Sequence, residues 1–79
     1  MTDDEALLRD ALRLVLEQPD LELSPEMGLG TTQGWDSFAH ISLMVELEDS
    51  AGIVFEAEEI PEVITVPALL EAMKAHRRS

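Results

Sequence analysis

Ser37 and His40 form a pair whose residue types and spacing could support nucleophilic chemistry. Residues three apart lie on one side of a helix, so the imidazole could reach back toward the hydroxyl. No strand is expected before Ser37, so this turn does not resemble the nucleophile elbow of a hydrolase. A hydrolase also needs an oxyanion hole and a substrate pocket, for which 79 residues leave little room. We therefore expect no catalytic residue and no enzyme activity.

Metal binding is the other chemistry that the residue types could support. His40 and His76 are far apart in the sequence and belong to no motif with ligand spacing. Glu56, Glu58 and Glu59 lack the Asp/Asn–Gly pattern of a calcium loop. The absence of Cys removes thiolate zinc sites, cysteine nucleophiles and disulfides together. The sequence therefore predicts a solvated acidic face and no metal site.

The chain is strongly acidic. Its 17 Asp and Glu residues outnumber 5 Lys and Arg, which gives a net charge of −12. Such a charge repels nucleic acid and anionic membrane surfaces, and it favours partners with basic patches. The acidic N-terminus is the opposite of a signal-peptide start, and no apolar run approaches the roughly 20 residues of a membrane span. These features predict a cytoplasmic protein that binds neither nucleic acid nor membranes.

Apolar residues at helical spacing, with few aromatic residues and almost no alternation, predict an all-α fold. The length predicts a single domain, residues 1–79. A first helix is expected over residues 3–17, with Thr2 and Glu5 as a capping box. Residues 18–35 contain too many Pro and Gly for a regular element, and they predict a long connection that packs on the core.

The second half of the chain predicts three further helical segments. A second helix begins near Asp36 or Ser37, either of which could cap it, and runs to about Asp49 or Ser50, where Gly52 is well placed to end it. Residues 56–60 can make one or two helical turns, and a last helix is expected over residues 66–77. The predicted architecture is a small four-helix bundle with three main helices, a short third helix and a long loop between the first two.

The second helix carries more apolar side chains than one core face requires. One group is expected in the core: Leu43, Met44 and Leu47. More than about a quarter-turn away lies a second stripe, which consists of Phe38, Ile41 and Val45. The helical wheel leaves open whether the second stripe is exposed or the helix is buried on both sides. If exposed, the second stripe with Glu48 and Asp49 at its border is typical of a protein-docking surface.

Residues 34–38, Gly-Trp-Asp-Ser-Phe, resemble the modification site of the acyl carrier protein family. The similarity continues without a gap through residues 45–49, 52–55, 58–60 and 65–66. Its specific part covers roughly residues 34–73. The N-terminal helix and loop agree with the family in length and acidity but carry no distinctive motif.

The resemblance implies a modified serine. Ser37, which follows Asp36 of the motif, would carry 4′-phosphopantetheine transferred from coenzyme A by a phosphopantetheinyl transferase. The thiol of this arm would hold an acyl or aminoacyl group as a thioester. A loading ligase and downstream transferase or synthase enzymes, with basic patches, would be the partners of a monomeric carrier. Phe38, Ile41, Val45, Glu48 and Asp49 would form the docking surface.

The motif also departs from the usual pattern. Phe38 stands where Leu is usual, and Ala39, His40 and Ser42 stand where fatty-acid carriers often have acidic residues. In this the chain is more similar to free-standing carriers of polyketide, nonribosomal-peptide or other specialised pathways. The alternative is an acidic helical protein-interaction module without a prosthetic group. It would use the same second stripe, with Ser37 only as a cap.

Overall fold

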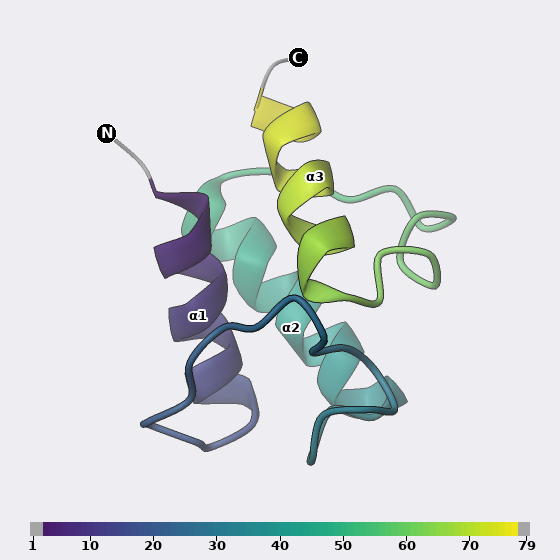
Figure 1. Ribbon diagram of the computed structural model, residues 1–79. Coiled ribbons are helices and arrows are strands. Elements are labelled where there is room, and N and C mark those ends of the chain that lie inside the picture. The colour runs from purple at the N-terminus through teal and green to yellow at the C-terminus, as the bar shows by residue number, and fades with distance from the viewer. Residues whose placement is uncertain (1–2, 78–79) are drawn as a thin grey trace.

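The computed structural model describes residues 3–77 and contains three helices. They are α1 (Asp4–Val15), α2 (Ser37–Ala51) and α3 (Val66–Arg77). Residues 3–77 form no strand, and their one antiparallel bridge joins Gly28 to Thr65. α1 contacts both other helices. It begins at the end of the molecule where α3 finishes, whereas α2 begins at the opposite end (Figure 1). The all-α class predicted from the sequence is confirmed.

α1 is shorter than predicted at its C-terminal end. The predicted capping residue Thr2 lies outside the described residues, and Asp3 is the N-cap, since its carboxylate accepts a hydrogen bond from Glu5 N at 3.1 Å. The helix ends at Val15 rather than near residue 17. Glu17 has a positive φ of 55°, in the left-handed region that cannot continue a right-handed helix.

α2 begins and ends close to where the sequence predicts. Asp36, rather than Ser37, is the N-cap: its Oδ1 accepts a hydrogen bond from Ala39 N at 2.9 Å. At the other end Gly52 adopts a left-handed φ of 69° and donates its N–H to Glu48 O at 3.0 Å. Glycine adopts this conformation without steric cost, so it ends the helix here. Ser37 is consequently the first residue of a 15-residue helix.

The core lies between the three helices. Six side chains of residues 3–77 are 0% exposed: Leu8 and Leu12 from α1, Leu43 and Leu47 from α2, and Leu69 and Met73 from α3. The predicted core residues of α2 are confirmed, because Met44 is also 2% exposed. Trp35, from the connection before α2, adds an aromatic side chain that is 2% exposed. Each such side chain contributes on the order of 1.5–3 kcal/mol by leaving water.

The long connection between α1 and α2 is tied to the start of α3. Leu29 N donates to Ile64 O at 2.8 Å, and Val66 N donates to Met27 O at 3.1 Å. Gly28, between them, has no side chain, and a Cβ there would lie 2.7 Å from Ile64 O. Glycine therefore permits the close approach of the two segments, and the connection is fixed rather than loose.

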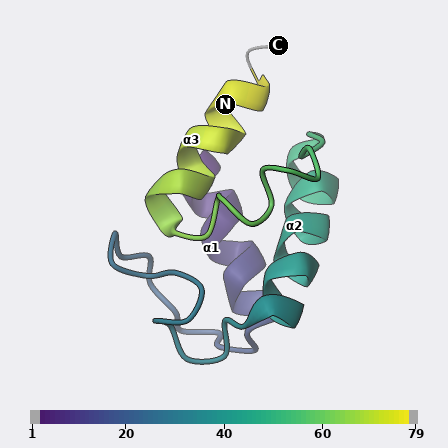
Figure 2. The same cartoon turned by 90° about the vertical axis from the view of Figure 1, so that its right-hand side faces the viewer.

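The connection between α2 and α3 does not form the short helix predicted at residues 56–60. It makes successive turns, in which Glu59 N donates to Glu56 O at 3.0 Å and Glu62 N donates to Glu59 O at 2.8 Å. Pro61 has no N–H to donate and disfavours a helical residue before it, so the turns do not extend into a helix. Figure 2 shows this connection passing from the end of α2 to the start of α3.

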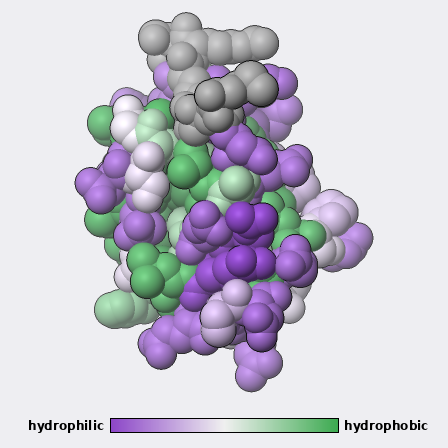
Figure 3. All heavy atoms as spheres, turned by 90° about the vertical axis from the view of Figure 1, so that its left-hand side faces the viewer, coloured by the Kyte–Doolittle hydropathy of each residue, from purple (hydrophilic) through white to green (hydrophobic). Residues whose placement is uncertain are grey.

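The outer face of α1 is polar. Arg9 pairs with Asp10 at 3.2 Å, and Arg13 pairs with Glu22 of the long connection at 3.1 Å. On this side of the molecule, hydrophilic side chains gather in a central cluster with apolar side chains around it (Figure 3). Among residues 3–77, the helices are too short or too polar to cross a membrane.

Candidate functional site

Ser37 lies at the exposed N-terminal end of α2. The N-cap Asp36 fixes the start of the helix by accepting the hydrogen bond from Ala39 N. The first backbone N–H groups of a helix and its dipole stabilise negative charge, including that of a phosphate ester. Ser37 is accordingly exposed to solvent, in a place that stabilises a negatively charged group.

The second stripe is exposed. Phe38, Ile41 and Val45 are 75%, 58% and 60% exposed, respectively, whereas the opposite face of α2 is buried in the core. Of the two interpretations left open by the helical wheel, the structure supports the one in which α2 has a single buried face. An apolar surface therefore begins next to Ser37. Its role in docking partners stays a prediction.

The two acidic residues at the border of the second stripe differ in their environment. Asp49 is exposed, as expected for a charge that meets partners. Glu48 is half-buried, and its Oε2 accepts a hydrogen bond from Phe55 N at 2.8 Å. Glu48 thus also holds the chain after α2 in place, which the sequence pattern did not indicate.

His40 is a buried side chain, only 3% exposed. Its Nδ1 lies 3.0 Å from Nε1 of Trp35, and its Nε2 lies 2.9 Å from Ile60 O. Because an indole N–H can only donate, we assign the lone pair to Nδ1 and the proton to Nε2, which donates to Ile60 O. Both nitrogens are occupied, so this ring has no acceptor left for the proton of Ser37.

A hollow adjoins Ser37, and we call it the Ser37 hollow. It has a volume of about 290 Å³. Besides Ser37 and His40, its lining consists of five apolar side chains: Leu29, Ile41, Ile60, Pro61 and Ile64. These residues come from the long connection, α2 and the connection before α3, and the hydrogen bond from Leu29 N to Ile64 O joins two of the walls.

Sequence reasoning missed the Ser37 hollow. One signal was available: His40 precedes Leu43, Met44 and Leu47 by three, four and seven residues, which places it on the core face of α2. The walls contributed by the two connections carry no comparable signal, because only tertiary hydrogen bonds bring Leu29 next to Ile64.

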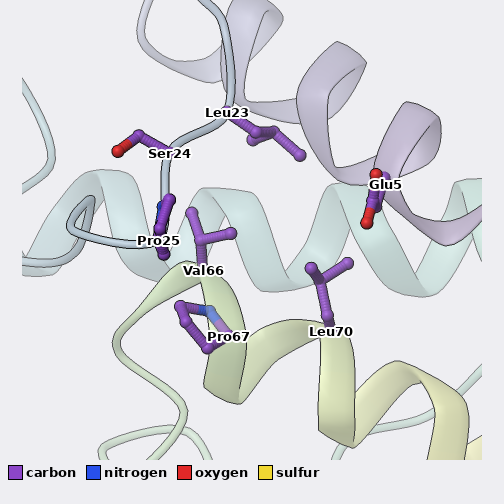
Figure 4. A pocket seen from close by; sticks show the side chains of 7 residues that line it. All are labelled: Glu5, Leu23, Ser24, Pro25, Val66, Pro67 and Leu70. Carbon is purple, nitrogen blue, oxygen red and sulfur yellow. The ribbon is translucent and has the colours of Figure 1, made fainter.

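A second concave site lies between α1, the long connection and α3, and we call it the α1–α3 groove (Figure 4). Its volume is about 250 Å³. Leu23, Val66 and Leu70 supply apolar walls, and the carboxylate of Glu5 lies at one end. Neither Ser37 nor any member of the second stripe lines it. We therefore place the candidate site at Ser37.

The glutamates between α2 and α3 do not gather around a common point. Glu56 and Glu58 are exposed, whereas Glu59 accepts from His76 Nε2–H, which lies 2.9 Å from its Oε2. This hydrogen bond from His76 holds the pKa of the Glu59 carboxyl below its ordinary value, against the opposing effect of burial. Over residues 3–77, no three His, Cys, Asp or Glu side chains are placed to hold a metal ion.

Comparisons of the chain with protein families, with curated proteins and with solved structures give no match. The features that bear on function are therefore Ser37, the second stripe and the Ser37 hollow.

Proposed function

We propose that the chain is a carrier protein modified at Ser37. A phosphopantetheinyl transferase joins the Ser37 oxygen to the phosphorus that bears the pantetheine arm of coenzyme A. The bond to the nucleotide breaks, adenosine 3′,5′-bisphosphate leaves, and the hydroxyl proton is lost. The thiol at the end of the arm then holds an acyl or aminoacyl group as a thioester and presents it to successive enzymes.

One observation carries this proposal: an exposed serine at a helix N-terminus borders an exposed apolar stripe on the same helix. A carrier needs a reachable attachment point and a surface that its enzymes can recognise, but it needs no catalytic base of its own. This explains how Ser37 can be functional although His40 is fully engaged with Trp35 and Ile60.

The acidic charge suits a carrier that visits several enzymes. A net charge of −12 accelerates encounter with basic surfaces and gives short-lived, salt-sensitive complexes. In this proposal the carrier is a cytoplasmic monomer. Its partners are the transferase, a loading ligase and downstream enzymes. The turns before α3 take the place of the short third helix of a four-helix bundle.

Intact mass spectrometry tests the proposal. The purified chain is incubated with coenzyme A and a broad-specificity phosphopantetheinyl transferase. We expect one pantetheinyl-phosphate adduct on the wild type and on Ser50→Ala, an exposed serine at the other end of α2, and no adduct on Ser37→Ala. No adduct on the wild type, or an adduct that persists on Ser37→Ala, contradicts the proposal.

The second stripe equally suits an acidic interaction module that carries no group. In such a protein Ser37 is only the first residue of α2, and Ser37→Ala leaves partner binding and pathway function intact. An unmodified wild type with functional Ser37→Ala would favour the module, whereas loss of pathway function in a folded Ser37→Ala variant favours the carrier.

A further inference from the structure

His40 is hydrogen-bonded on both sides of its ring, and its two partners belong to different segments. Trp35 precedes α2 and is itself 2% exposed, while Ile60 lies in the turns before α3. His40 N also donates to Asp36 O at 2.8 Å, so the backbone of His40 belongs to the first turn of α2. The imidazole therefore ties the turns before α3 to the N-terminal end of α2.

The segment that His40 holds forms much of the Ser37 hollow. Ile60, Pro61 and Ile64 supply three of its walls, and the hydrogen bond from His40 Nε2 to Ile60 O fixes the first of them. Ile64 is fixed separately, by the hydrogen bond that its carbonyl accepts from Leu29 N. Hydrogen bonds from His40 and from Leu29 thus both hold residues that line the hollow.

The hollow offers little to a cation. Among the described residues, its lining contains neither Asp, Glu, Lys nor Arg, and both nitrogens of His40 are already bonded. An ammonium group that entered would lose water without gaining a charged partner, which is unfavourable. The volume of about 290 Å³ compares with a closed cavity of ~150 Å³ that accepts benzene. Since benzene has six carbons, the hollow has room for a neutral aliphatic chain of at least about six carbons.

We propose that His40 is a positioning residue that determines which cargo the carrier shelters. Through Trp35 and Ile60 it keeps the Ser37 hollow in a form that receives an uncharged aliphatic group of at least about six carbons and refuses one that ends in an ammonium group. This inference rests on the proposed carrier function, because the cargo is tethered at Ser37, on the rim of the hollow. It favours an apolar acyl cargo over an aminoacyl cargo.

A matched pair of cargoes tests the proposal. Hexanoyl and 6-aminohexanoyl arms are loaded on Ser37 from the corresponding coenzyme A thioesters, and methyl NMR signals are compared with those of the unloaded arm. We expect the hexanoyl arm to shift the signals of Ile41, Ile60 and Ile64, and the 6-aminohexanoyl arm to leave them as in the unloaded form. Equal shifts with both cargoes, or no shift with either, overturn the proposal.

Variants of His40 separate positioning from a purely structural role. The amide of His40→Gln keeps one acceptor and one donor, whereas His40→Leu keeps an apolar side chain but leaves Trp35 Nε1–H unpaired. We expect His40→Gln to preserve discrimination between the two cargoes and folded His40→Leu to lose it. Met73→Ala, a core variant outside the hollow, should lower stability and keep discrimination. Discrimination that survives in His40→Leu contradicts the positioning role.

Two measurements do not depend on cargo loading. Nitrogen-15 NMR of the wild type should show the neutral His40 ring with its proton on Nε2, and a proton on Nδ1 contradicts the assignment even if His40→Leu does not fold. If Ser37 accepts no pantetheine, the carrier proposal fails, and titration with free 1-hexanol then tests the hollow by itself. Saturable shifts of Ile60 and Ile64 in the wild type support it, and their absence overturns it.

Discussion

At the residue scale, Phe38 and Leu43 show how position on one helix separates stability from recognition. Both are large and apolar, yet Phe38 is 75% exposed and Leu43 is 0% exposed. The hydrophobic free energy gained on folding therefore comes from the face that contains Leu43. The face that contains Phe38 keeps its apolar surface available for a partner, where the same driving force can contribute to binding.

Truncation should affect the two faces of α2 differently. Leu43→Ala or Leu47→Ala leaves a cavity between the helices and should lower the free energy of unfolding by roughly 2–5 kcal/mol. Phe38→Ala should change it by no more than about 0.5 kcal/mol, and it should slow delivery of the carried group to partner enzymes. Urea denaturation and a transfer assay measure the two effects. A large loss of stability in Phe38→Ala would contradict the exposed position.

At the element scale, hydrogen bonds join the connections to the helices and to each other. Glu59 in the turns accepts from His76 on α3, Leu29 in the long connection donates to Ile64, and Glu48 on α2 accepts from Phe55 N. The hollow beside Ser37 exists because such bonds hold the connections against the helices. Its geometry should therefore respond to changes made in a connection, as well as to changes made in α2.

The pair formed by Glu59 and His76 should make stability depend on pH. The lowered pKa of Glu59 means that its contribution is fully present above its ordinary pKa and is lost as the pH falls through the lowered value. Glu59→Gln should therefore be less stable than the wild type at neutral pH, and the difference should shrink in acid. Thermal unfolding from pH 7 downward measures this, with the exposed Glu58→Gln as the control. A difference in stability between the wild type and Glu59→Gln that grows as the pH falls would contradict the lowered pKa of Glu59.

Crowding at Gly28 should disturb the tie between the long connection and α3. The added Cβ of Gly28→Ala would lie 2.7 Å from Ile64 O and 3.2 Å from Thr65 Cγ2, so the segments must separate. Overpacking of this kind costs about 1–3 kcal/mol, and amide exchange of Leu29 N should accelerate. Gly30→Ala is a useful comparison, since its Cβ meets no atom within 4 Å and tests only the cost of a φ of 87°. If the amide of Leu29 stays equally protected from exchange in Gly28→Ala, the expected separation of the two segments is contradicted.

Local signals account for the parts of this fold that the sequence could predict. Asp36 and Gly52 delimit α2 because capping depends on neighbouring residues, and the wheel identifies its core face because burial follows helical periodicity. The turns before α3 and the Ser37 hollow were not predictable in this way. They depend on contacts between residues distant in sequence, such as His40 with Ile60 and Leu29 with Ile64.

At the scale of the whole molecule, the net charge of −12 should govern how fast enzymes find Ser37. Between about 0.01 M and about 1 M salt the Debye length falls from ~30 Å to ~3 Å. The second-order rate of Ser37 modification by a transferase with a basic surface should therefore fall on the order of tenfold or more. The rate is measured by quenching the reaction at successive times and recording intact masses, at each salt concentration in this range. A rate that does not change with salt would show that the net charge does not steer the encounter.

Two variants with the same change in net charge distinguish local from global steering. Asp49→Lys places a positive charge at the border of the second stripe, whereas Glu71→Lys makes the same change at an exposed position on α3. If the acidic border steers the transferase, Asp49→Lys should slow modification several-fold more than Glu71→Lys at low salt, and the two rates should converge at high salt, where the interaction is screened. Equal slowing by both variants would mean that the total charge acts, and that the border of the second stripe has no special part in the encounter.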